Sequence, residues 1–204
     1  MFHSLFAPLL SSRRLDRLSE LAAIGEQVSA ASLLLYPGLG ARDASREVRE
    51  LERAAADIRR RLEARLARAG VHLIDPRLIC EAASEMVRII RLIARIVDCR
   101  EWLRLETAPA EALELEAVAA RGVQLVAEFA RKYATFRGSP VEPEGADLIK
   151  RRAGELYHRG VARAFGGFPD PLDVLRQKTL YDALLGIVAG SDRALESLRN
   201  ASSD

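Results

Sequence analysis

Cysteine and histidine are scarce in this chain, whose 204 residues include two cysteines and three histidines. Cys80 and Cys99 lie in a stretch that we expect to form one helix, where 19 residues of rise separate them by about 28 Å. This separation excludes a disulfide between them, and two unpaired thiols suit a reducing cytosol. Nothing in the context of the three histidines marks one of them as the base of a Ser-His-Asp triad.

Long apolar runs and an excess of one charge are also missing. The longest uncharged run, residues 27–41, is broken by Pro37 and is shorter than the ~20 residues that span a bilayer. The 31 basic and 29 acidic residues nearly cancel, which leaves no chain-wide basic field for nucleic acid. The first residues lack the positive leader and cleavage site of a secretory signal. We therefore expect a cytoplasmic protein that neither inserts into the membrane nor binds nucleic acid, and that reaches the inner membrane only through a partner.

The sequence does contain a helical repeat of apolar residues almost throughout. Of its residues 49% are hydrophobic, enough to bury a full core, and they recur every three or four positions. Alternating runs of β-branched residues are absent, so we predict an all-α fold. Proline and glycine residues mark the expected ends of six helices. Their expected bounds are Arg13 to Leu35, Asp43 to Ala69, Asp75-Pro76 onward, Thr107 to about Arg137, Ser139-Pro140 to Phe165, and Asp170-Pro171 onward.

Two of these helices share the same opening, an aspartate followed by a proline. An aspartate accepts bonds from the free amides of the first turn, and proline loses nothing at the first helical position. The helix after Asp75 has the broadest apolar face, so we expect it to be the central element. With short loops, the pattern predicts an antiparallel bundle. We predict a single domain over residues 1–204, built from two three-helix pseudo-repeats at about 11–105 and 106–200.

The C-terminal half carries a resemblance to a known family. Residues 156–165 and 170–181 resemble the last helical hairpin of PhoU-like proteins encoded beside Pit-type phosphate transporters. Residues 2–5, 49–53 and 74–77 are also similar, so that the likeness spans nearly the whole chain. The resemblance implies a six-helix bundle and a role as an accessory or regulatory protein of phosphate transport. Its implied partners are a membrane phosphate transporter or the proteins that regulate it.

The resemblance also implies metal clusters, held by acidic residues four positions apart on one helix face. In this chain the first acid is present as Glu52, but Ala56 stands four residues later. The remaining positions implied by the resemblance carry Val87, Arg88, Arg91, Lys150, Gly154, Leu185 and Ala189. Because a multivalent cation needs several converging carboxylates, we expect no metal cluster and no other cofactor.

Three arginines form our candidate site for an anion or a partner protein. Arg88, Arg91 and Arg95 fall at i, i+3 and i+7 and therefore share one stripe of the third helix. Their guanidinium groups can bind phosphate or the carboxylates of a partner. The alternative is a set of ordinary exposed ion pairs with the acidic residues of the same stripe. Those residues are Glu81, Glu85 and Asp98.

Two other functions stay open beside phosphate-transport regulation. The chain could be a general helical interaction module, also as a homodimer, unrelated to phosphate. Glu155 and His158 match the Glu-x-x-His spacing of di-iron carboxylate enzymes. Such a site needs a second copy of the motif, yet neither His3 nor His72 has a glutamate three residues before it. We therefore expect a protein that is not an enzyme.

Overall fold

The computed structural model describes residues 7–36, 41–68, 75–103, 108–135, 144–166 and 170–201, with backbone alone for 7–17, 41–42 and 101–103. Six α-helices account for nearly all of these residues, and no strand occurs among them, which confirms the all-α prediction. The helices are α1 (Ala7–Leu33), α2 (Ala41–Ala67), α3 (Pro76–Leu103), α4 (Ala110–Thr135), α5 (Ala146–Ala164) and α6 (Pro171–Asn200).

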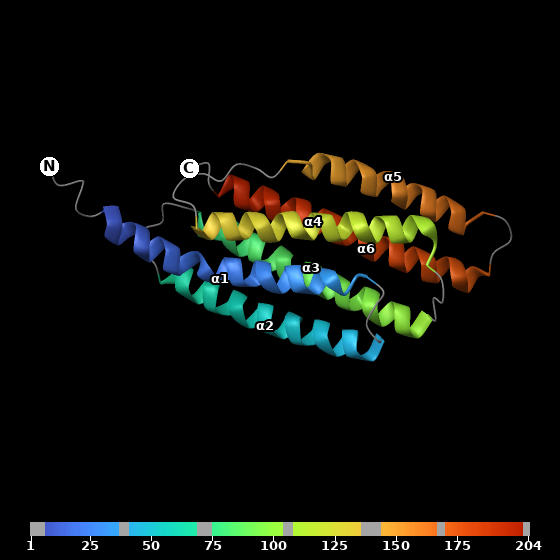
Figure 1. The fold of residues 1–204 in the computed structure, drawn as a ribbon, viewed down its shortest axis with the longest axis horizontal. Coiled ribbons are helices and arrows are strands. Elements are labelled where there is room, and N and C mark those ends of the chain that lie inside the picture. Colours follow the sequence, from blue (N-terminus) through green and yellow to red (C-terminus); the bar gives the residue numbers. More distant parts are fainter. Residues whose placement is uncertain are drawn as a thin grey trace.

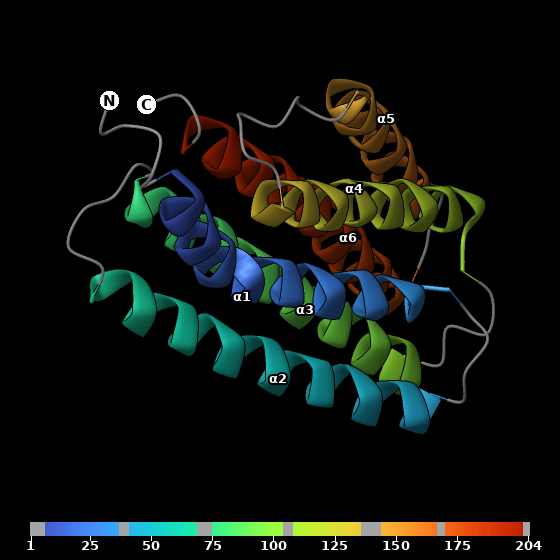
Figure 2. The ribbon, with the colours of Figure 1, turned by 60° about the vertical axis from the view of Figure 1, so that its left-hand side comes forward.

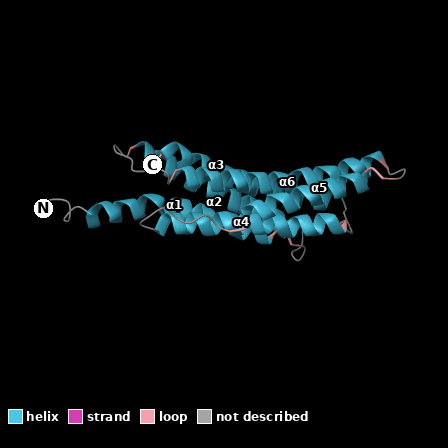
Figure 3. Ribbon diagram, turned by 90° about the horizontal axis from the view of Figure 1, so that it is seen from above, coloured by secondary structure: helices cyan, strands magenta, loops and turns pink. Residues whose placement is uncertain are grey.

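The helices form two layers with one helix on each flank (Figures 1 and 2). Helices α1 and α4 pack against each other in one layer, and α3 and α6 in the other (Figure 3). Helix α2 packs against α1 and α3, and α5 takes the corresponding place beside α4 and α6. One broad face of the molecule is therefore built from α2, α3, α6 and α5.

The two Asp-Pro openings cap helices as predicted. Asp75 Oδ1 accepts a hydrogen bond of 2.8 Å from the backbone amide of Arg77. Asp170 Oδ1 accepts one of 2.9 Å from the amide of Leu172, two residues into the first turn of α6. Each carboxylate satisfies an amide that has no partner within its helix, which fixes where α3 and α6 begin.

We expect Asp170→Ala to lower the free energy of unfolding by about 1 kcal/mol, because the Leu172 amide loses its acceptor. Chemical denaturation followed by circular dichroism measures this loss. Asp170→Asn keeps an acceptor oxygen and serves as the control. Equal destabilisation by both variants would contradict a capping role for the side chain.

The predicted start of the fifth helix was wrong. The sequence placed it at Ser139-Pro140, which lie outside the described residues, but residues 144–145 form a turn and α5 begins only at Ala146. Gly145 has φ of +93°, a left-handed conformation that interrupts a helix and that glycine adopts without strain. At the other end of the chain, α1 is already helical at Ala7, six residues before the predicted start, and Pro8 fits its first turn.

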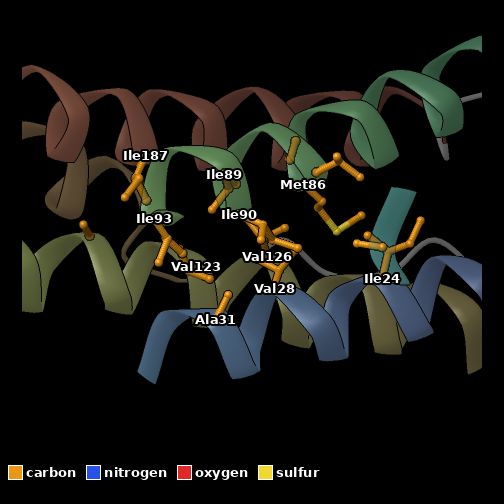
Figure 4. Close-up of a cluster of buried hydrophobic side chains, with 14 of the residues drawn as sticks. Ile24, Val28, Ala31, Met86, Ile89, Ile90, Ile93, Val123, Val126 and Ile187 are labelled. Carbon is orange, nitrogen blue, oxygen red and sulfur yellow. The ribbon is translucent and has the colours of Figure 1, made fainter. Parts of the chain in front are cut away.

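Helix α3 is the central element, as its broad apolar face predicted. It packs against α1, α2 and α6, and Ile89, Ile90 and Ile93 are fully buried. Figure 4 shows their side chains meeting those of α1, α4 and α6, including Val28, Val126 and Ile187. Because this packing buries most sides of α3, only a narrow stripe of the helix is exposed to solvent.

Candidate functional site

The surface stripe of α3 contains the three arginines of the candidate site. Within residues 76–95, the exposed positions are 77, 81, 84, 88, 91 and 95, all on one side of the helix between α2 and α6. We use the name arginine stripe for Arg88, Arg91 and Arg95. The structure therefore brings these three side chains to one face, as the helical spacing predicted.

Arg91 forms an ion pair with Glu52 on the neighbouring helix α2. Its Nε atom donates a hydrogen bond of 2.8 Å to Glu52 Oε1, and Arg91 stays 60% exposed. These are two of the positions at which the resemblance implied metal ligands. Here a guanidinium group supplies the positive charge that faces the carboxylate.

Arg88 shares its acidic partner with a second arginine that comes from α6. Glu85 Oε2 lies 3.5 Å from Arg88 and accepts a hydrogen bond of 2.9 Å from Arg193. The Glu85 pair is in part the ordinary i, i+3 ion pair that the alternative interpretation expected. Two guanidinium groups nevertheless converge on a single carboxylate, which leaves one positive charge in excess.

Arg95 has no ion pair with any residue that the structure describes. The acid that faces it from α6, Asp182, binds Lys178 at 2.6 Å and accepts a hydrogen bond of 2.9 Å from the Tyr157 hydroxyl. Desolvation opposes the ionisation of Asp182, but these two hydrogen bonds outweigh it and hold its pKa below the ordinary value. Asp182 is therefore already engaged, and the exposed Arg95 guanidinium lies within hydrogen-bond reach of the Cys99 sulfur.

Around Arg88, Arg91 and Arg95, arginines outnumber the carboxylates that pair with them. Arg88, Arg91, Arg95 and Arg193 present four guanidinium groups, whereas only two carboxylates, Glu52 and Glu85, pair with them. Exposed ion pairs are worth at most about 1 kcal/mol each and exchange easily with other partners. The arrangement can therefore bind an acidic surface or an anion.

The other positions implied by the resemblance hold no acidic cluster either. Lys150 on α5 pairs with Asp192 at 2.6 Å, and a side chain added at Gly154 would meet no atom within 4 Å. Among the described residues, no group of three or more His, Cys, Asp or Glu side chains is placed to hold a metal ion. These residues do not fit the multinuclear clusters that the resemblance implies, and the absence of bound metal stays a prediction.

The Glu-x-x-His motif of the enzyme hypothesis lies on the outer surface of α5. Glu155 is exposed and pairs with Arg152 at 3.3 Å, and the exposed His158 ring packs edge-on against Tyr157. Neither side chain points into a site shared with other described metal-ligating residues. This geometry gives the di-iron hypothesis no support.

Sequence reasoning missed the contribution of Arg193 and the pairing of Glu52 with Arg91. Arg193 stands 108 residues from Glu85, and Glu52 stands 39 residues from Arg91. No local pattern signals such contacts, because they depend on which helices become neighbours.

None of the described helices is both long and apolar enough to cross a membrane.

Comparison with known proteins adds a structural likeness. No protein-family model matches the chain, and no curated protein matches it in sequence. Among solved structures, a PhoU-like protein from Shewanella oneidensis MR-1 superposes with a TM-score of 0.65. The match covers 93% of this chain and 96% of that chain at 14% sequence identity. The chain therefore has the fold of a PhoU-like helical bundle.

Proposed function

We propose that this protein is a PhoU-like regulator of phosphate transport, which acts in the bacterial cytoplasm by docking to another protein. It performs no catalysis and uses no metal cluster. The proposal is supported by the fold shared with a PhoU-like protein over nearly the full length of both chains. The observation that carries docking is the surplus of guanidinium groups on the part of the α3 face around Arg88, Arg91 and Arg95.

The partner that this face fits is an acidic surface, on a membrane phosphate transporter or on a protein that regulates one. Arg88, Arg91 and Arg95 project between α2 and α6 and are exposed. Each planar guanidinium group can form two parallel hydrogen bonds to one carboxylate. Exposed charges at a rim act mainly on the association rate and its salt dependence. Binding should therefore weaken as salt rises.

The double variant Arg88→Ala/Arg91→Ala tests the stripe directly. We expect it to weaken partner binding at least about tenfold and to flatten the salt dependence, because each lost guanidinium removes an attractive charge. The melting temperature should change little, since both side chains are exposed and their ion pairs are weak. Binding is measured with the purified partner over a series of salt concentrations.

A matched control removes two positive charges from the opposite layer. Arg131→Ala/Lys132→Ala changes two exposed residues near the end of α4 and should leave binding intact. If wild type and the stripe variant bind the partner equally well, the arginines do not form a docking site, and the alternative of ordinary surface ion pairs holds.

Affinity purification from cells grown with low and with ample phosphate would identify the partner. Recovery of a phosphate transporter or a phosphate-sensing protein supports the proposal. Recovery of other partners only would favour a general helical interaction module. Stoichiometric iron or zinc in the purified protein would contradict the metal-free mode of action.

A further inference from the structure

Large apolar side chains are exposed where α5 ends and α6 begins. Phe165 is 59% exposed, Leu172 51% and Leu175 62%. They are three of the seven large hydrophobic residues that are exposed in the described part of the chain, and they fall within eleven positions of the sequence. We use the name apolar tip for Phe165, Leu172 and Leu175.

The apolar tip lies on a part of the bundle that projects. Phe165 directly follows the last residue of α5, and both leucines lie in the first two turns of α6. Figures 1 and 3 show this end of the α5 and α6 pair extending beyond the start of α4. Three side chains on a convex end cannot bury the roughly 800 Å² per partner of a stable protein complex. A lipid surface, by contrast, can close around them.

Basic residues flank the apolar tip on both helices. Over its whole length α5 carries five basic and two acidic residues, the largest positive excess of the six helices. Arg159 lies about 9 Å along the helix axis from Phe165, which is about one Debye length at physiological salt. Four cations stand within two turns of the tip, namely Arg159 and Arg163 on α5, and Arg176 and Lys178 on α6. They can therefore reach the phosphates of lipid headgroups while the tip is in contact with a bilayer.

The carboxylates at this end are already engaged. Asp170 faces the Leu172 amide as the cap of α6. The other three each bind one of the four cations, Glu111 with Arg163 at 3.1 Å, Asp173 with Arg176 at 3.0 Å, and Asp182 with Lys178 at 2.6 Å. Exposed ion pairs exchange easily with other partners, so headgroup phosphates can take the place of these carboxylates. The tip thus has no excess of negative charge that an anionic lipid surface would repel.

We propose that the apolar tip enters the interface of a bilayer that contains anionic phospholipid, with the flanking cations at the level of the headgroup phosphates. The contact does not span the bilayer, and it is weaker than a single myristoyl chain, whose association constant is about 10⁴ M⁻¹. It adds most when a membrane partner already holds the chain near the bilayer, since its effective concentration is then high. The inference goes beyond the docking proposal and adds a direct lipid contact, whereas the sequence led us to expect contact through a partner only.

Co-sedimentation of the purified chain with sucrose-loaded vesicles tests this inference. With vesicles of phosphatidylcholine and phosphatidylglycerol, we expect half of the protein to be bound at about 1 mM lipid. Pure phosphatidylcholine should bind about fivefold more weakly, because the cations then lose their attraction to anionic headgroups. Absence of binding up to about 10 mM of the mixed lipid would overturn the proposal. The assay contains no protein partner, so this proposal and the docking proposal can fail independently.

Two matched double variants separate the tip from apolar exposure elsewhere. Phe165→Ser/Leu175→Ser should weaken binding to the mixed vesicles at least about tenfold, because both side chains lose the apolar area that enters the lipid. Leu33→Ser/Leu148→Ser removes two leucines that are 62% and 63% exposed outside the tip, and it should leave binding unchanged. Circular dichroism spectra confirm that each variant is folded. Equal binding by the two double variants would overturn the proposal.

The arginine stripe is compared with the tip in the same assay, because it is another possible source of attraction to anionic lipid. Arg88→Ala/Arg91→Ala should reduce vesicle binding less than the tip variant does. A larger loss in the stripe variant would show that the stripe, and not the tip, contacts the lipid. If the tip variant binds vesicles like wild type but no longer recovers a protein in affinity purification, the tip contacts a protein and the lipid proposal is wrong.

Discussion

Gly160→Ala is expected to lower the free energy of unfolding by about 3 kcal/mol, the upper end of the range for overpacking a core. A Cβ atom at Gly160 on α5 would overlap the ring of Tyr181 on α6, and Tyr181 is fully buried. Because the ring is fully buried, either it must shift within the core or the two helices must separate. Urea denaturation followed by far-ultraviolet circular dichroism measures the loss.

The same helix supplies a control for this prediction. Gly154 also lies within α5, but a Cβ atom there meets nothing within 4 Å. Gly154→Ala should stabilise the protein by about 0.5–1 kcal/mol, because alanine restricts the unfolded chain more than glycine. Adding Tyr181→Leu to Gly160→Ala should recover part of the loss. Similar effects of the two alanine variants would show that the Tyr181 contact does not limit the approach of α5 and α6.

Arg100→Met is expected to destabilise the protein by about 3–5 kcal/mol near pH 7, since it leaves a buried carboxylate without its cation. Glu116 on α4 is 2% exposed, and its Oε1 lies 2.5 Å from the Arg100 guanidinium on α3. Arg100 also donates a hydrogen bond of 2.6 Å to the carbonyl oxygen of Leu35, just after the end of α1. One side chain thus links three helices.

The pH dependence of this loss has a definite sign. Burial raises the pKa of Glu116, and the Arg100 guanidinium opposes part of that rise. A carboxyl with a raised pKa stabilises the fold while it is protonated, and this stabilisation is lost as the pH rises through the pKa of the folded state. Without Arg100 the pKa of Glu116 rises further. The variant should therefore lose more stability at about pH 7 than at about pH 5.

Glu116→Gln distinguishes the buried charge from the other contacts of Arg100. The amide carries no charge, so this variant should be less destabilised than Arg100→Met, with a stability that varies less with pH. Unfolding by urea at both pH values provides the measurement. A pH-independent loss in Arg100→Met would show that the bond to Leu35, and not the ionisation of Glu116, dominates.

Most of the fold was predictable because it depends on local signals. The period of apolar residues predicted six helices, and the two Asp-Pro pairs fixed the starts of α3 and α6. The start of α5 was predicted too early, because Ser139-Pro140 has the pattern of a helix opening while the left-handed turn at Gly145 postpones the helix. The residue patterns that start a helix are short, so more than one of them can occur in the segment between two helices.

The candidate site was predictable only in part. The spacing of Arg88, Arg91 and Arg95 placed them on one side of α3, and the structure shows all three exposed. Their partners could not be found in this way. Arg91 pairs with Glu52 across to α2, and Arg193 reaches Glu85 from α6. Long-range pairs of this kind arise from the arrangement of helices in space.

By itself, the sequence determined the six helices and their buried faces, because these features depend on neighbours within a few turns. Only the tertiary structure decided which charges meet. It placed α3 between α2 and α6, brought Arg193 to Glu85 and brought Arg91 to Glu52. The physical reason is that an ion pair or a cavity between helices requires atoms from distant parts of the chain to lie within a few ångströms.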